Sequence, residues 1–128
     1  QKHSIYAGKN FANSGSWGPW ITTSDSLPPV EDLHLTVSLN GQTMQSAYGR
    51  EMLFSVPEQI AYASSLLTLQ PGDVIATGSP DGTGGSRMPK CYLKSNDILA
   101  MTIEGIGTLS NTVSKGGGGA VRQMRTSL

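Results

Sequence analysis

Hydrophobic and polar residues alternate most clearly in residues 33–39, LHLTVSL. Every second residue is apolar, so the apolar side chains share one face of a strand and the polar ones the other. Asn40 and Gly41 follow, and both tolerate the positive φ that the central residues of a tight hairpin turn require. The pattern therefore predicts a β-hairpin in which residues 42–48 form the returning strand.

A helix is predicted next along the chain. Ser55 and Glu58 have the spacing of a capping box, in which each side chain bonds the backbone N–H of the other residue. Pro57 stands in the first turn, where a missing N–H is not needed. Apolar residues then recur at helical spacing, so we expect a helix over residues 56–67. Its buried stripe is expected to comprise Val56, Ile60, Ala63 and Leu67.

Short apolar runs between turn residues predict further strands. The candidates are residues 21–23, 73–77, 91–93, 98–104 and 106–113. Residues 73–77 (DVIAT) have the character of a short buried strand, and Gly105 separates the last two candidates. A chain of mostly strands with one helix favours a β-roll or sandwich over alternating strand–helix units.

Glycine and proline are frequent, with 16 and 7 residues among 128. They predict many turns and loops, including a small-residue loop at residues 78–86. Residues 8–20 combine glycines with two tryptophans and a phenylalanine, which favours a loop held by its aromatic residues. Four consecutive glycines near the end predict a flexible tail over residues 114–128, leaving residues 1–113 as the folded part.

The charge balance excludes several classes of function. Nine Lys and Arg residues balance nine Asp and Glu residues, and no basic cluster marks a surface for nucleic acid or an anionic membrane. No apolar run is long enough to span a bilayer. A single cysteine, Cys91, excludes an internal disulfide and a multi-cysteine zinc site, and fits a reducing cytoplasm.

Two loops are candidates for chemistry. Lys9 lies beside Gly8 in the aromatic loop, where a lysine stabilises an anionic oxygen or is simply solvated. Gly78 and Ser79 follow the predicted strand 73–77, and the exposed N–H groups of such a loop suit a carboxylate or a phosphate. The alternative is a long turn without a ligand. The spacing of a phosphate-binding P-loop is absent, which disfavours a nucleotide site.

The remaining polar candidates favour ordinary structural roles. His34 is expected to be exposed on the polar face of its strand, and His3 to be a loop histidine. Cys91 is expected to be a half-buried structural thiol. Glu31 and Asp32 stand in a polar connector, where solvated carboxylates are favoured over a metal site.

Four segments resemble the fumarylacetoacetate hydrolase family, in the C-terminal part of its catalytic domain, and they occur in the family's order. They are residues 8–11 with 18–21 (GKNF and GPWI), residues 54–62 (FSVPEQIAY), residues 69–80 (LQPGDVIATGSP) and residues 103–109 (IEGIGTL). The resemblance extends over about residues 1–113. It implies a mixed β-roll and a dimeric, cytoplasmic enzyme.

The family resemblance also implies a reaction class. Members bind a divalent metal, Mg²⁺ or Mn²⁺ and in some cases Ca²⁺. They act on 2-oxo or β-diketo acids by C–C bond hydrolysis, decarboxylation or isomerisation, in the breakdown of aromatic and related compounds. The metal chelates a carboxylate and an adjacent carbonyl oxygen, which stabilises negative charge developing there.

The resemblance assigns roles to individual residues. Lys9 matches the family lysine beside the metal, Ser79 matches the hydroxyl residue that holds the substrate carboxylate with Gly78 beside it, and Gln1 matches a substrate-contacting glutamine. Asn13 stands where some members have a threonine near the metal, so it is a candidate to bond metal-bound water.

The family's metal ligands, a Glu-x-Glu pair and an aspartate, precede the lysine and have no counterpart in this sequence. The sequence is therefore expected to be the C-terminal part of such an enzyme, with the N-terminal part of the domain missing. The alternative is a non-catalytic chain of the same fold that binds small carboxylates or a partner.

Overall fold

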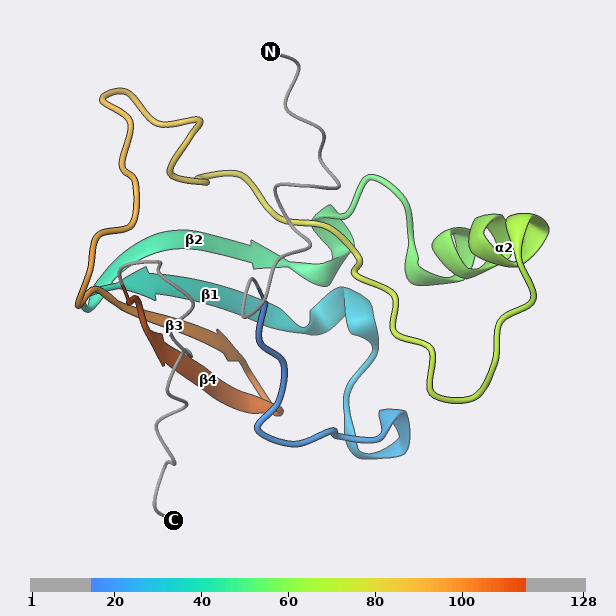
Figure 1. The fold of residues 1–128 in the computed structure, drawn as a ribbon. Helices are drawn as coiled ribbons and strands as arrows, with labels where there is room; N and C mark the ends of the chain where they lie inside the picture. The colour runs from blue at the N-terminus through green and yellow to red at the C-terminus, as the bar shows by residue number, and fades with distance from the viewer. Residues whose placement is uncertain (1–14, 115–128) are drawn as a thin grey trace.

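The computed structural model describes residues 15–114, which form a four-stranded antiparallel sheet and one α-helix (Figure 1). The strands are β1 (His34–Leu39), β2 (Gln42–Tyr48), β3 (Ile98–Ile103) and β4 (Gly107–Thr112). The helix is α2 (Val56–Leu66), and the short 3₁₀ turns are η1 (Ser24–Ser26), η2 (Val30–Asp32) and η3 (Gly49–Glu51). The strand order in the sheet is β2-β1-β3-β4. The prediction of a mainly β fold with one helix is confirmed.

The first hairpin forms where the alternating pattern places it. Asn40 and Gly41 have φ values of 52° and 83°, so the turn uses the left-handed conformations that this residue pair tolerates. Strand β1 pairs with β2 from His34↔Tyr48 to Leu39↔Gln42, with one irregularity after Val37. The predicted hairpin and both of its strands are confirmed.

The second hairpin joins β3 to β4 around Gly105, whose φ is 81°. Strand β3 also pairs with β1, with Leu35 opposite Ile103 and Val37 opposite Met101. These pairings place Leu35, Val37, Met101 and Ile103 on one apolar face of the sheet. The core of the described residues is nevertheless small, since Val37 is the one apolar side chain among them that is buried, at 8% exposure.

Asp97 ties the two hairpins together at one end of the sheet. Its carboxylate accepts hydrogen bonds from the Asn40 side chain at 2.9 Å and from the Lys94 backbone N–H at 2.7 Å. The Asn40 side chain, and after it the Lys94 backbone, holds the pKa of Asp97 below its ordinary value of 3.8. The ionised carboxylate therefore contributes stability above about pH 4, and this contribution is lost as the pH falls through the lowered pKa.

We expect Asp97→Asn to remove part of the acid-induced loss of stability. Urea unfolding followed by circular dichroism between pH 2.5 and 7 measures this directly, because Asp97→Asn lowers stability at pH 7 and flattens its decline below about pH 4. Asp25→Asn, on an exposed 3₁₀ turn, is the matched control and should keep the decline of the unchanged chain. A decline of equal steepness in the Asp97 variant would contradict the assignment.

Helix α2 begins as predicted. Ser55 Oγ accepts from the Glu58 backbone N–H, and the Glu58 carboxylate accepts from the Ser55 N–H at 2.7 Å. Bonds from the Ser55 hydroxyl and N–H also keep the pKa of Glu58 below its ordinary value. The predicted capping box is therefore confirmed, and the helix ends within one residue of its expected end.

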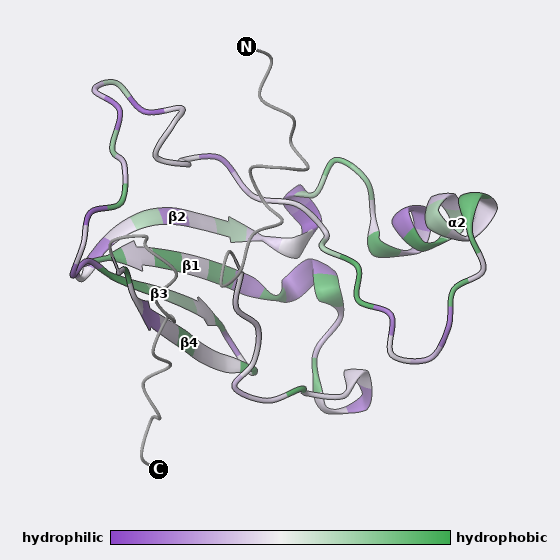
Figure 2. Ribbon diagram, viewed as in Figure 1, coloured by the Kyte–Doolittle hydropathy of each residue, from purple (hydrophilic) through white to green (hydrophobic). Residues whose placement is uncertain are grey.

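The predicted buried stripe of this helix is wrong. Ile60 and Leu67 are 44% and 55% exposed, while Val56 and Ala63 are half-buried. The physical reason is the position of α2, which extends away from the sheet in Figure 1 and shares few contacts with other described elements. Figure 2 shows hydrophobic residues on the helix and on the segments leading into and out of it.

The predicted strand at residues 73–77 is also wrong. The turn before it forms, with Gly72 at φ 99° and the Asp73 N–H donating to Gln70 O at 3.0 Å. The residues after it are exposed and lie outside the sheet, since no strand among residues 15–114 pairs with them. Residues 21–23 and 91–93 also lie outside the sheet, although Cys91 is the half-buried free thiol that we expected.

The aromatic loop is held at one tryptophan. Trp20 Nε1 donates to Ile106 O at 2.8 Å, and its ring lies against Gly107, where an added Cβ would be 2.5 Å from Trp20 Cζ2. Trp17, in contrast, is largely exposed. None of the helices within residues 15–114 has the length and apolar character needed to cross a membrane.

Candidate functional site

A cleft of about 720 Å³ opens at one end of the apolar face of the sheet. Its floor consists of Leu35, Ala47 and Ile103, which the strand pairing places side by side. The walls are the residues around η2 and η3, the first turn of α2, and the loop over residues 77–81. The cleft therefore has hydroxyl, amide and carboxylate groups on its walls and a mostly apolar floor, as do sites for small organic ligands.

Two residues selected from the sequence, Gly78 and Ser79, line this cleft. Gly78 has a φ of 108°, a conformation that favours glycine, and it directs the chain so that Ser79 follows on the cleft wall. Ser79 is exposed, so its hydroxyl is accessible to a ligand. The other predicted site residues, Lys9, Gln1 and Asn13, lie outside the described residues, as does His3.

Two side chains near β2 hold the loop that follows Ser79. Gln45 Nε2 donates to Pro80 O at 2.6 Å and to Asp81 O at 3.0 Å. Arg87 donates through Nε to Gly82 O at 3.0 Å and through its guanidinium to Met44 O. The loop is therefore fixed on the sheet by side-chain bonds to backbone carbonyls.

Neither of these residues was predicted from the sequence. Gln45 is opposite Val37 in the β1–β2 pairing and so projects from the apolar face of the sheet. A polar residue at an inward position of a strand is the one signal that could have identified it. Arg87 carried no comparable signal, because its partners depend on how the loop folds.

We expect Gln45→Leu to release the loop without unfolding the sheet. The substitution keeps a side chain of similar size and removes two hydrogen bonds, each contributing about 1 kcal/mol. Hydrogen exchange should accelerate about tenfold at residues 81–87 and stay unchanged in β3 and β4. Gln42→Leu, at the exposed start of β2, is the matched control. Equal exchange in the Gln45 variant and the unchanged chain would contradict the role of Gln45.

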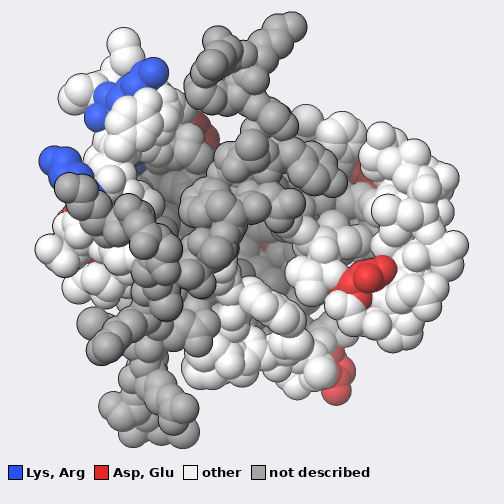
Figure 3. Space-filling view, in the orientation of Figure 1, with Lys and Arg blue, Asp and Glu red and all other residues white. Residues whose placement is uncertain are grey.

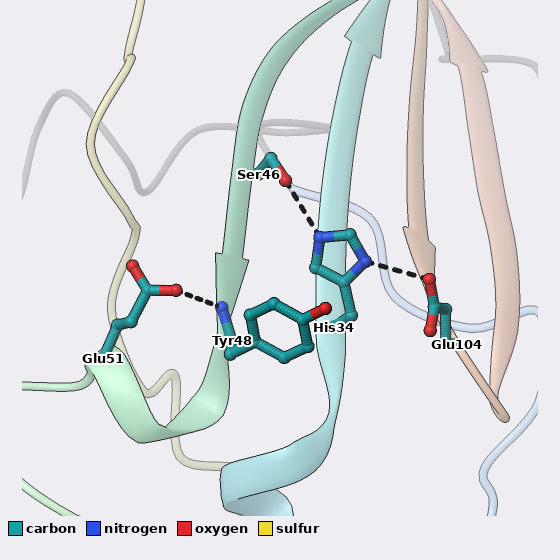
Figure 4. Close-up of polar contacts among 5 residues, drawn as sticks. All are labelled: His34, Ser46, Tyr48, Glu51 and Glu104. Atoms are coloured by element: carbon teal, nitrogen blue, oxygen red, sulfur yellow. Dashed lines mark hydrogen bonds and ion pairs between the residues drawn. The ribbon is translucent and has the colours of Figure 1, made fainter.

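A second polar cluster surrounds His34, shown in Figure 4. His34 Nδ1 lies 2.9 Å from Glu104 Oε1, and Nε2 lies 2.9 Å from Ser46 Oγ. The ring stacks on Tyr48 with 4.5 Å between centroids. The expectation that His34 is merely exposed is wrong: its side chain is only 19% exposed, because Ser46 on β2 and Glu104, which directly follows β3, lie on either side of it.

This cluster has the order of groups of a Ser–His–acid triad, but its position favours a structural role. The pairings His34↔Tyr48 and Leu35↔Ala47 place His34 on the face opposite the apolar floor of the cleft. The carboxylate of Glu104 is largely exposed to water. We therefore infer that these residues stabilise the packing of three adjacent strands against one another.

The described residues contain no cluster of carboxylates that could bind a metal. No three His, Cys, Asp or Glu side chains among residues 15–114 lie close enough to hold a metal ion. Glu51 and Asp81 line the cleft, but the Glu51 carboxylate accepts from the Tyr48 N–H at 2.7 Å. Glu31 and Asp32 are exposed, as expected, and Asp32 pairs with Arg50 at 3.2 Å.

Comparison with known proteins relates this chain to a described family. Residues 1–114 match the family described as Fumarylacetoacetate (FAA) hydrolase C-terminal. A 2,4-didehydro-3-deoxy-L-rhamnonate hydrolase from Sphingomonas sp. (strain SKA58) is 38% identical over 99 residues, which are 77% of this chain and 35% of that protein. The chain spans about 36% of the length of the curated relatives with which it aligns first.

Solved structures show the same fold. The fumarylacetoacetate hydrolase (EaFAH) from psychrophilic Exiguobacterium antarcticum is 40% identical, with a TM-score of 0.73, over 77% of this chain and 35% of that one. The maleylpyruvate hydrolase from Sphingobium sp. SYK-6, in complex with manganese (II) ion and pyruvate, is 35% identical, with a TM-score of 0.71. That match covers 78% of this chain and 35% of the other.

Proposed function

The chain belongs to the fumarylacetoacetate hydrolase family, and on that premise we propose that it supplies the carboxylate-binding part of an enzyme that acts on 2-oxo or β-diketo acids. The observation that carries the proposal is the position of Gly78 and Ser79 on the wall of the cleft. Family members include hydrolases and an isomerase, which supports C–C bond hydrolysis or isomerisation as the reaction, and decarboxylation is the third reaction that the family resemblance implies.

Ser79 would donate its hydroxyl hydrogen to a substrate carboxylate. The positive φ of Gly78 brings the backbone within reach of a ligand with no side chain in between. Gln45 is a positioning residue in this proposal, since it fixes the backbone directly after Ser79. Apolar floor residues such as Leu35 and Ile103 would contact the carbon chain of the substrate and exclude water.

Lys9 would add positive charge near the substrate oxygens, with Gln1 as a further contact and Asn13 as a partner of metal-bound water. These three assignments rest on the family resemblance. A lysine beside a developing anion lowers the energy of the charged transition state. Homodimerisation and a cytoplasmic location, which the family implies, belong to the same proposal.

A divalent metal, Mg²⁺ or Mn²⁺, polarises the carbonyl of a 2-oxo acid when it is bound. A manganese ion and pyruvate occur together in the maleylpyruvate hydrolase structure, which supports the use of a divalent metal in this family. The described residues do not fit a metal by themselves, because no ligand set is gathered among residues 15–114. The contribution that we assign to these residues is therefore the binding of the carboxylate.

Calorimetric titration of the purified chain tests this function. Oxalate and pyruvate should bind, and phosphate should bind more weakly, because a planar carboxylate is the ligand that we assign to this loop. Turnover of an acylpyruvate is then assayed with Mn²⁺ present. Preferential binding of phosphate, or no binding of either carboxylate, would contradict the proposal. Carboxylate binding without turnover would favour the alternative, a carboxylate-binding chain that is not itself catalytic.

A further inference from the structure

The cleft that carries Ser79 on its wall extends well beyond the residues assigned to the carboxylate. Its volume is about 720 Å³, and clefts of about 300–1,000 Å³ typically enclose most of a drug-sized ligand. A three-carbon acid such as pyruvate would fill only a small part of this space. The rest of the cleft is therefore available to the remainder of a larger substrate, and the residues that line it decide which chemical groups that remainder can have.

Apolar side chains line the cleft where the strands meet η3. Leu33 and Leu35 come from the beginning of β1, Ile103 from the end of β3, and Met52 from the residue after η3. All four side chains are half-buried, so water has limited access to them. The Met52 sulfur accepts a hydrogen bond from Gln59 Nε2 at 3.8 Å, which holds this side chain at the cleft. An adaptable thioether beside branched aliphatic groups is suited to contact with a hydrocarbon or aryl group.

The charged residues of the cleft are acidic. Glu51 and Asp81 line it, and no Lys, Arg or His is among the lining residues within the described part of the chain. Arg50, the neighbour of Glu51, pairs with Asp32 at 3.2 Å and lies over the Tyr48 ring at 4.2 Å. Figure 3 shows the Lys and Arg atoms of this view at the upper left, away from α2, whose first turn forms a wall of the cleft. The Glu51 carboxylate would therefore repel a second carboxylate on the substrate, with no described cation in the lining to offset the repulsion.

We propose that the cleft selects 2-oxo acids with one carboxylate and an apolar tail over 2-oxo dicarboxylates, and that Glu51 determines this specificity. The inference rests on the proposed function, since it takes residues 78 and 79 as the site of the 2-oxo acid carboxylate. The tail would lie on the apolar floor and on Met52. A terminal carboxylate in the same place would lose hydration without gaining a positive partner, which is unfavourable. Lys9, in the role proposed above, would act at the other end of the substrate, on its 2-oxo acid oxygens.

Calorimetric titration of the chain with pyruvate, 2-oxohexanoate and 2-oxoadipate tests this inference. The last two acids have equally long carbon chains, and they differ in that a terminal carboxylate replaces a terminal methyl group. Each methylene group that leaves water strengthens binding by up to about fourfold, so 2-oxohexanoate should bind at least about tenfold more tightly than pyruvate. At low ionic strength, 2-oxoadipate should bind at least about tenfold more weakly than 2-oxohexanoate, because its second carboxylate meets an apolar and acidic surface.

Two variants separate the charge from the apolar contact. Glu51→Gln removes the charge but keeps an oxygen that can accept the Tyr48 N–H, as Glu51 does at 2.7 Å. Its affinity for 2-oxoadipate should rise about threefold at low ionic strength, with a smaller change for 2-oxohexanoate. Asp25→Asn, on an exposed turn outside the cleft, is the matched control. Met52→Gln should reduce the advantage of 2-oxohexanoate over pyruvate at least about threefold, whereas Met88→Gln, at a 92% exposed position of another loop, should keep it.

Three results would overturn the inference and leave the proposed function intact, provided that pyruvate binding still depends on Ser79. They are 2-oxohexanoate binding no more tightly than pyruvate, as expected if another polypeptide segment covers the floor, 2-oxoadipate binding as tightly as 2-oxohexanoate, and an unchanged 2-oxoadipate affinity in Glu51→Gln. Failure of the proposed function gives a different result. In that case none of the three acids binds, or Ser79→Ala leaves their affinities unchanged, and the inference is overturned with it.

Discussion

Replacing Gly49 with alanine is expected to destabilise the fold more than any other conservative change near the cleft. A Cβ at this position would lie 1.8 Å from Val30 O and 2.7 Å from Val30 C. Both are backbone atoms, so no side-chain rotation relieves the clash. The Gly49 N–H also donates to Leu33 O at 2.9 Å, which fixes the two segments against each other.

The alanine at position 49 therefore forces η3 away from η2, and both segments form walls of the cleft. The expected loss is about 2–3 kcal/mol in the free energy of unfolding, the upper part of the range for overpacked sites. For a domain of this size the melting temperature should fall by more than about 10 °C. Thermal denaturation followed by circular dichroism measures the change.

Gly85→Ala is the matched control for this experiment. A Cβ at Gly85 would meet no atom within 4 Å, so its melting temperature should stay within a few degrees of the unchanged chain. Equal melting temperatures for the two variants would contradict the close approach of residues 30 and 49. Such a result would also contradict the close packing of η2 and η3, which form walls of the cleft.

Replacing Ser79 with alanine is expected to cause the largest loss of ligand binding. A hydrogen bond to a charged group contributes about 1.5–3 kcal/mol, which corresponds to roughly a 10- to 100-fold weaker affinity for oxalate. The change should leave the melting temperature almost unaltered, because Ser79 is exposed and its hydroxyl has no partner among the described residues. Calorimetry and thermal denaturation of the same sample separate the two effects.

Two further variants serve as controls for the Ser79→Ala measurement. Ser79→Thr retains a hydroxyl and should bind oxalate within a fewfold of the unchanged chain. Ser95→Ala removes an exposed serine from a distant turn and should have no effect. Equal affinities for Ser79→Ala and Ser95→Ala would contradict the role of Ser79.

Local features of the fold were predictable from the sequence. The Asn40–Gly41 turn and the Ser55–Glu58 capping box are specified by residues a few positions apart, and both formed as expected. The alternation in residues 33–39 likewise fixed which side chains face the core. These features depend little on the rest of the chain, so single-sequence reasoning reaches them.

Features that depend on distant partners were not predictable in the same way. The apolar run at residues 73–77 suggested a buried strand, but a strand needs a neighbour, and the described residues provide none. The prediction of a buried apolar stripe on α2 is wrong for the same reason. His34 was misjudged because its partners, Ser46 and Glu104, are brought to it by pairing of β1 with β2 and β3.

The candidate site was predictable only in part. Ser79 and Gly78 were identified from their loop and from the family resemblance, and the structure places them on a cleft. Gln45 was missed, since its hydrogen bonds join residues 35 and 36 positions apart along the chain. Side chains that position a loop leave little trace in a sequence unless they interrupt an apolar pattern.

The proposed function depends above all on the binding of the carboxylate of a small 2-oxo acid by residues 78 and 79. The most direct test is an NMR titration of the ¹⁵N-labelled chain with oxalate, which reports binding residue by residue. We expect the amide signals of Thr77, Gly78 and Ser79 to shift most, and Ser79→Ala to abolish these shifts at the same oxalate concentration. Shifts centred elsewhere, such as on His34 and Ser46, or shifts unchanged in Ser79→Ala, would contradict it.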